Sequence, residues 1–222
     1  MCFSATADFT GSVVLGTIGV ATLKEVTRPR ELLLASMPCL FALHEFVEGF
    51  VWLGLDGRLS QQVAHNAGAA YVLYAQGILP FLLPFSIYLI EPTKRQRRRM
   101  LGFVILGGVL ALYLLWGLTA YPLAISEQEH SILYINVITN TDLVALLYVV
   151  ATCGALFFSG FGDLVLLGWA NLIGLLTVMM VKRYAFTSVW CAYAAAVSII
   201  IYFFFRRSRV ERFRLRDVIA AI

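Results

Sequence analysis

The stretch LLLASMPCLFALHEFVEGFVWLGL, residues 32–55, is long and apolar enough to cross a lipid bilayer, yet it contains one histidine and two glutamates. A membrane-spanning helix needs about 20 mostly apolar residues, because the hydrocarbon core of a bilayer is roughly 30 Å thick. His44, Glu45 and Glu48 all lie inside this run. The stretch therefore predicts a transmembrane helix with ionisable groups, which are costly in a membrane unless they face other protein groups.

The whole chain has the composition of an integral membrane protein. Of its 222 residues, 60% are hydrophobic and 14% are charged, and the mean hydropathy is +0.83. A soluble domain of this length cannot bury so many apolar side chains. The pI of about 9.0 does not indicate nucleic-acid binding, because the basic residues cluster beside apolar segments, as they do where Lys and Arg orient a chain in a membrane.

Apolar runs of membrane-spanning length recur along the chain and predict an all-α polytopic bundle of seven transmembrane helices, with the lipid bilayer as its partner. The predicted spans are residues 9–26, 32–55, 67–90, 100–121, 142–160, 164–181 and 186–205. They form one domain, residues 1–205, followed by a basic juxtamembrane tail, residues 206–222. The longer connection 122–141 contains HSILYINVI, which is interpreted as a short interfacial helix.

The distribution of basic residues predicts the orientation of these spans. Of the 17 lysines and arginines, all but Arg58, Lys182 and Arg183 lie near 24–30, in 91–99 or in the tail. With seven spans these three segments fall on one side of the membrane, and excess Lys and Arg mark the cytoplasmic side. The N-terminus is therefore expected outside and the C-terminus in the cytoplasm.

The ionisable groups of the second span share one helix face. His44 and Glu48 are four residues apart and Glu45 and Glu48 are three apart, which are the spacings that bring side chains together on a helix. With the second span running outward, Glu48 lies roughly 10 Å from its outer end at a rise of 1.5 Å per residue. These groups are expected to face the bundle interior in the outer half of the membrane.

Three interpretations of this polar stripe stay open. In the first, His and Glu side chains bind a transition metal ion, zinc or copper, and the protein is a metal-binding protein or a membrane metalloenzyme. In the second, the protein is a proton-coupled transporter or a sensor of a small molecule or lipid, with Glu48 as the titrating group. In the third, the stripe ties helices together without chemistry. The sequence does not decide the oligomeric state.

The candidate site residues come from several parts of the chain that the predicted topology places on the outer side. The candidate metal ligands are His44, Glu48, Glu45, Cys2 and His130. The residues expected to line the same pocket are Trp52, Gln76, Asn171, Ser188, Trp190 and Cys191.

Three stretches together point to a known family. MCFSATADF (residues 1–9), EGFVW (48–52) and FTSVWCAYAAAVS (186–198) resemble an uncharacterised family of small bacterial seven-helix membrane proteins with an N-terminal MCFSATA-type motif. The resemblance implies a shared fold, an extracytoplasmic N-terminal motif and a place in the bacterial inner membrane. It implies no activity, and it favours Glu48, Cys2 and Trp190 as parts of a shared site.

Overall fold

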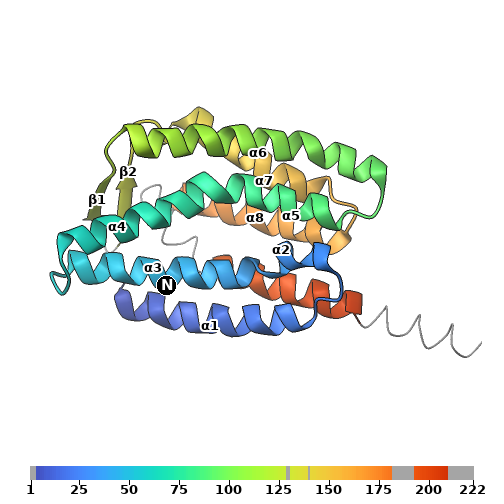
Figure 1. Cartoon of the computed structure of the whole chain (residues 1–222), viewed down its shortest axis with the longest axis horizontal. Helices are drawn as coiled ribbons and strands as arrows, with labels where there is room; N and C mark the ends of the chain where they lie inside the picture. The colour runs from blue at the N-terminus through green and yellow to red at the C-terminus, as the bar shows by residue number, and fades with distance from the viewer. Residues whose placement is uncertain (1–3, 129–130, 140, 182–192, 210–222) are drawn as a thin grey trace, which may run out of the picture.

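The computed structural model describes residues 4–128, 131–139, 141–181 and 193–209, with the backbone alone for 177–181. Long helices lie side by side along one axis (Figure 1). Their order is α1 (Ala5–Lys24), a 3-10 turn η1 (Pro29–Glu31), α2 (Leu32–Ala35), α3 (Met37–Leu55), α4 (Gln61–Val72), a π-helix η2 (Leu73–Ile78), α5 (Leu79–Ile90), α6 (Lys94–Ala120), β1 (Ala124–Gln128), β2 (Ser131–Ile135), α7 (Asp142–Phe157) and α8 (Gly162–Val181). Residues 193–209 are also helical.

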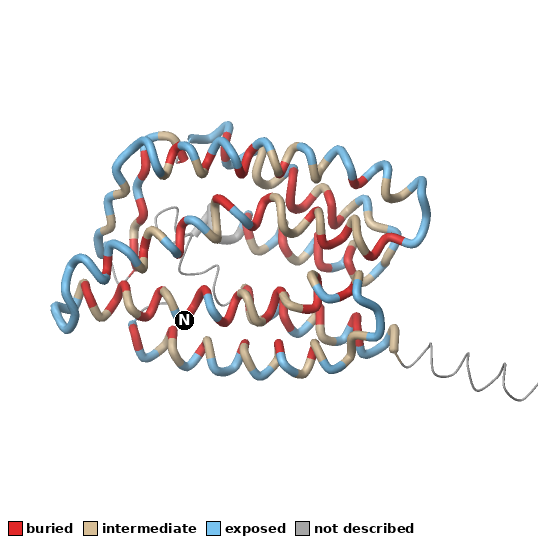
Figure 2. Tube along the Cα trace, in the orientation of Figure 1, coloured by how far each residue is buried: buried red, intermediate tan, exposed pale blue. Residues whose placement is uncertain are grey.

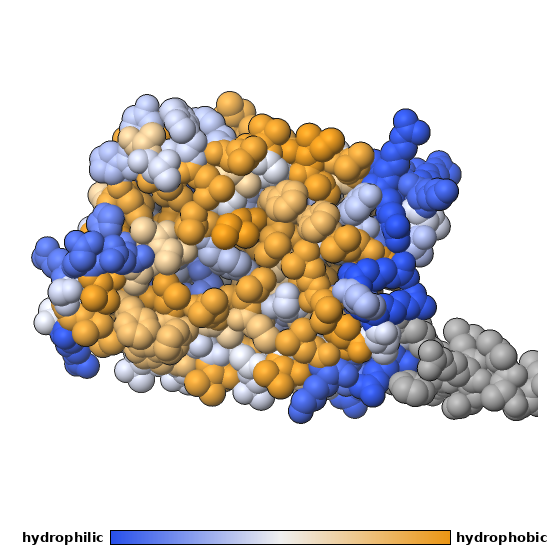
Figure 3. Space-filling model, viewed as in Figure 1, coloured by the Kyte–Doolittle hydropathy of each residue, from blue (hydrophilic) through white to orange (hydrophobic). Residues whose placement is uncertain are grey.

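Within the described residues, four helical stretches are long and apolar enough to cross a membrane: Ala5–Lys24, Pro29–Leu55, Gln61–Ile90 and Lys94–Ala120. Asp142–Phe157 and Gly162–Leu176 are shorter apolar helices. Apolar residues cover most of the middle of the visible face, while hydrophilic residues gather at its two ends (Figure 3). The helical, membrane-type character predicted from the sequence is therefore confirmed, whereas seven crossings and their orientation stay predictions.

Helices α1 and α3 pack closely because small residues line their contact. The buried residues of α1 recur every three or four positions, which is the spacing of one helix face: Ala5, Asp8, Gly11, Leu15, Gly19 and Thr22. A Cβ atom on Gly19 would lie 2.8 Å from the backbone nitrogen of Cys39 on α3. Exposed residues run along the outer faces of α1 and α6, and buried ones gather where helices face one another (Figure 2).

The predicted third span is a continuous helical stretch with an irregular middle. The π-helix η2 lies between α4 and α5 and ends two residues before Pro80. Proline has no N–H to donate into the helical ladder, so backbone carbonyls near it need other donors. Such a donor is supplied by the Tyr148 hydroxyl of α7, which donates to the backbone carbonyl of Ala75 at 2.8 Å.

The interfacial helix predicted in the connection 122–141 is wrong, because this segment forms an antiparallel β-hairpin. Strands β1 and β2 pair with Ala124 opposite Ile135 and Gln128 opposite Ser131. Alternate residues Ile132 and Tyr134 are buried against other apolar side chains, which is a period of two and not of 3.6. An isolated two-stranded hairpin is marginal in water, so its packing on the end of the bundle holds it in place.

The segments with most basic residues meet at the opposite end of the bundle from the hairpin. The turn after α1, the start of α6 and the end of the helix 193–209 all lie there (Figure 1). Arg209 donates to the carboxylate of Glu25 at 3.1 Å and to the backbone carbonyl of Lys24 at 2.9 Å. We call this the basic end of the molecule.

Candidate functional site

Three buried carboxylates meet between α1 and α3, in the half of the bundle away from the basic end. Asp8 comes from α1, and Glu45 and Glu48 come from α3. One oxygen from each lies within 4.8 Å of the others, and the exposed fractions of the three residues are 0%, 3% and 0%. We call Asp8, Glu45 and Glu48 the carboxylate cluster.

The local sequence explains how Asp8 reaches this place. The Ser4 hydroxyl caps α1 by accepting the N–H of Ala7 at 3.2 Å, as serine does at helix starts. The helix therefore begins early enough to put Asp8 in its first turn, on the buried face. Gly11 follows one turn later, and a Cβ atom there would lie 3.5 Å from an oxygen of Glu45, so α1 passes close to α3 at this level.

Asp8 is the least satisfied member of the carboxylate cluster. Neither of its side-chain oxygens has a hydrogen-bond partner among the described residues, although the residue is fully buried. A buried carboxylate without compensation is among the most unfavourable groups that a folded protein contains. This arrangement indicates that Asp8 is completed by a group from outside the described residues.

The charge of the carboxylate cluster supports the same conclusion. The three oxygens lie within 4.8 Å of one another, and two unit charges at that distance repel each other by roughly 3 kcal/mol at an effective dielectric constant of 20. The three pairs of the cluster multiply that penalty, and burial adds the loss of hydration. A positive charge between the three carboxylates would offset this repulsion.

Two tyrosine hydroxyls complete the surroundings of Glu48. The Tyr71 hydroxyl of α4 hydrogen-bonds to the Glu48 carboxylate, and Tyr134 of β2 lies beside that carboxylate. Burial, followed by the nearby carboxylates of Glu48 and Asp8, raises the pKa of Tyr134 well above its usual value. Its hydroxyl therefore keeps its proton and remains a donor. Tyr71 fixes the orientation of the Glu48 carboxylate, and Tyr134 offers a second donor nearby.

His44 lies beside the carboxylate cluster and not within it. Its ring stacks on Tyr71, with ring centroids 3.7 Å apart and planes 15° from parallel. Tyr71 in turn stacks on Tyr134 at 4.8 Å. Among the described residues, the group whose ligand atoms approach one another contains no nitrogen or sulfur donor. His44 instead lines a small cavity together with Glu45 and Tyr74.

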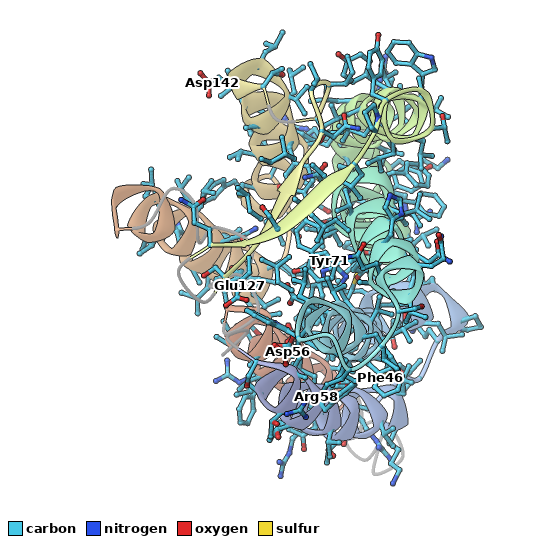
Figure 4. All side chains as sticks on the ribbon, turned by 90° about the vertical axis from the view of Figure 1, so that its left-hand side faces the viewer. Phe46, Asp56, Arg58, Tyr71, Glu127 and Asp142 are labelled. Atoms are coloured by element: carbon cyan, nitrogen blue, oxygen red, sulfur yellow. The ribbon has the colours of Figure 1, made fainter. Side chains whose placement is uncertain are left out.

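The other sequence-predicted residues have different positions. Trp52 is buried in the apolar cluster that surrounds Tyr71 and Tyr134, which lies inside the end of the molecule that faces the viewer in Figure 4. Gln76 belongs to the π-helix. Asn171 of α8 is buried and lines a separate cavity of about 30 Å³. Cys2, His130, Ser188, Trp190 and Cys191 lie outside the described residues.

Sequence reasoning missed Asp8, Tyr71 and Tyr134 as site residues. The sequence did contain an indication of Asp8, because its spacing from Gly11, Leu15 and Gly19 places all four residues on one face of a helix. Tyr71 and Tyr134 carried no comparable signal, since their approach to Glu48 depends on how distant elements pack.

Comparison with known proteins places the chain in a family. Neither the curated proteins nor the solved structures contain a match to it. One family model, described as a family of unknown function (DUF6629), matches residues 1–216. This match confirms the resemblance to an uncharacterised family and covers nearly the whole chain. The chain belongs to the DUF6629 family of unknown function.

Proposed function

We propose that the protein is a multi-pass membrane protein that binds one divalent cation at the carboxylate cluster. The observation that carries this proposal is the fully buried Asp8, whose two oxygens have no hydrogen-bond partner among the described residues and which faces two further carboxylates. A divalent cation offsets the repulsion among the three groups and completes the coordination of Asp8. No protein group in the described ranges takes that place.

The donor atoms favour an oxygen-preferring cation. Carboxylates suit Mg²⁺, Ca²⁺ and Mn²⁺, whereas copper and zinc sites usually include imidazole or thiolate ligands. The sequence-based expectation of zinc or copper rested on His44 together with Cys2 or His130. We therefore place Mn²⁺, Mg²⁺ and Ca²⁺ first and keep Zn²⁺ as a competitor in the test.

The residues around such a site have two different roles. Asp8, Glu45 and Glu48 would hold the cation, and Tyr71 would orient Glu48 by a hydrogen bond, as outer partners of metal ligands commonly do. The chemistry that a cation of this kind supplies is polarisation of an oxygen atom that it binds. If the protein is an enzyme, its reacting group therefore lies at the carboxylate cluster, inside the bundle.

The second candidate is a proton-coupled transporter or small-ligand sensor with Glu48 as the titrating group. The three adjacent buried carboxyls favour it, because carboxyl groups that lie close together can share and pass on a proton. The two candidates differ in whether purified protein binds a cation at all, so one binding measurement separates them.

The binding measurement uses Mn²⁺, whose electron paramagnetic resonance signal distinguishes free from bound ion. We expect purified, metal-depleted protein to bind about one Mn²⁺ per chain, and Glu48→Gln to abolish this binding. Asp56→Asn is the matched control, because Asp56 ends the same helix but is exposed. The proposal fails if the wild-type chain binds none of Mn²⁺, Mg²⁺, Ca²⁺ and Zn²⁺, or if Glu48→Gln binds Mn²⁺ as the wild type does.

We also propose that the chain crosses the bacterial inner membrane seven times, with its N-terminus outside and its C-terminus in the cytoplasm. Three basic segments that are distant in the sequence lie at the same end of the bundle (Figure 3), as the positive-inside rule requires. The carboxylate cluster then lies in the outer half of the membrane.

Labelling of single cysteines tests this orientation. In a background without the four native cysteines, an impermeant maleimide added to intact cells is expected to label Arg58→Cys, in the exposed turn between α3 and α4. Arg98→Cys, at the start of α6, is expected to react only after the membrane is opened. The reverse pattern would show that the orientation is inverted.

A further inference from the structure

Four positively charged side chains at the start of α6 have no ion-pair partner among the described residues. An open cleft of about 520 Å³ is lined by Lys94, Arg95, Arg98 and Arg99, which are all exposed. We call these four residues the basic cleft. Among the described residues no ion pair involves any of them, so four like charges face the same space without a neutralising partner.

Other cations at the same end do have partners. Arg207 pairs with Asp163 at 3.3 Å and Arg209 pairs with Glu25 at 3.1 Å. Arg97, the remaining arginine in this turn of α6, donates to the backbone carbonyl of Glu91 at 2.8 Å. The basic cleft thus differs from Arg97, Arg207 and Arg209, which have partners at the same end of the molecule.

The position of these cations at the N-terminus of a helix makes their arrangement less favourable. The first turn of α6 contains no acidic residue, although the N-terminus of a helix is itself partly positive and favours anions. Cations there are unfavourable unless an anion binds. Phosphate is an anion that both arginine side chains and helix N-termini recognise well.

An apolar stripe continues from the basic cleft along the same face of α6. From Arg98 the residues Leu101, Ile105, Val109 and Leu112 follow at helical spacings of three and four. These four apolar residues are between 44% and 70% exposed. Ten residues of helix after Arg98 span roughly 15 Å, which is the thickness of one leaflet of a bilayer core.

We propose that the basic cleft and this apolar stripe together bind one anionic phospholipid, with its phosphate among the four cations and an acyl chain along Leu101, Ile105 and Val109. The charge of the cleft selects an anionic headgroup, and the continuation of the stripe selects a lipid over a free anion. Arginine holds the phosphate by paired N–H donors, while lysine contributes a point charge. This site is separate from the carboxylate cluster, and it does not depend on a cation binding there.

The test titrates the purified full chain, in a neutral detergent, with phosphatidylglycerol and with phosphatidylcholine, and counts bound lipid by native mass spectrometry. We expect phosphatidylglycerol to bind with a clear preference. The double variant Arg98→Gln/Arg99→Gln is expected to weaken that binding roughly 30-fold, which corresponds to about 1 kcal/mol for each charge removed. Glycerol phosphate, which has the anionic group without acyl chains, is expected to compete poorly.

The matched control is Arg28→Gln/Arg30→Gln, which removes the same charge from another loop at the same end and is expected to keep the preference. Three results would overturn the proposal. In the first, the wild type binds the two lipids equally. In the second, the control and the cleft variant lose the same amount of phosphatidylglycerol binding. In the third, glycerol phosphate competes as strongly as the full lipid does.

Discussion

Replacing Asp8 by asparagine is expected to abolish the rise in melting temperature that a divalent cation gives the wild-type protein. A ligand at 100 times its dissociation constant stabilises the folded state by about 2.7 kcal/mol. For a chain of this size each kcal/mol shifts the melting temperature by roughly 2–4 °C. The wild type should therefore melt roughly 5–10 °C higher with Mn²⁺ than with a chelator, and Asp8→Asn should show no difference.

Without a cation the same substitution is expected to leave stability unchanged or to raise it. Asparagine has nearly the size of aspartate, and its amide donates hydrogen bonds to carboxylates such as Glu45 and Glu48. It also removes one of the three charges that repel one another. The measurement is thermal unfolding in detergent, followed by intrinsic fluorescence, with and without a chelator.

Asp56→Asn is again the control, and it should keep the full cation effect. The result that contradicts the proposal is a loss of stability in Asp8→Asn that is the same in both conditions. In that case the carboxylate cluster only ties α1 to α3.

Replacing Gly107 by alanine is expected to destabilise the protein by about 2–3 kcal/mol, the upper part of the usual range for overpacking. A Cβ atom at Gly107 on α6 would collide with the backbone carbonyl oxygen of Pro80 and would lie 3.2 Å from the Cα of Phe81. Backbone atoms cannot rotate away as a side chain can. The carbonyl of Pro80 also lacks its usual helical donor, because the residue four positions later is Pro84.

The matched control is Gly102→Ala, one and a half turns earlier on the same helix. Among the described residues no heavy atom lies within 4 Å of a Cβ placed there, and alanine favours helix over glycine by up to about 1 kcal/mol. Gly102→Ala should therefore melt at or above the wild-type temperature, while Gly107→Ala melts several degrees lower. Equal melting temperatures would show that α5 and α6 do not approach each other as described.

The sequence predicted the elements near the site better than it predicted the site. The span expected at 32–55 corresponds to the helical stretch Pro29–Leu55, because hydropathy is a property of consecutive residues. Glu45 and Glu48 share a site, as their spacing of three predicts. Asp8 was missed because the polar start of the chain was interpreted as lying outside the first helix, which in fact begins at Ala5.

The position of His44 shows that residues on one helix face need not belong to the same site. Its spacing from Glu48 predicts proximity, but α3 is buried on more than one side, with Phe41, His44 and Trp52 among its buried residues. A central helix meets several neighbours, so side chains a few positions apart contact different ones. His44 stacks on Tyr71 of α4, whereas Glu45 and Glu48 meet Asp8 of α1. Only the packing of the bundle decides between such neighbours.

The hairpin that supplies Tyr134 has a consequence for how the protein is made. The chain leaves the ribosome N-terminus first, and its early segments begin to assemble before the later ones exist. Asp8, Glu45 and Glu48 are therefore synthesised, and available to meet, before Tyr134 is. The tyrosine follows only after α6 has been made, as part of strands that close over the end of the bundle. Biosynthesis thus sets an order of assembly, in which the carboxylates come first and the Tyr134 hydroxyl beside Glu48 is added later.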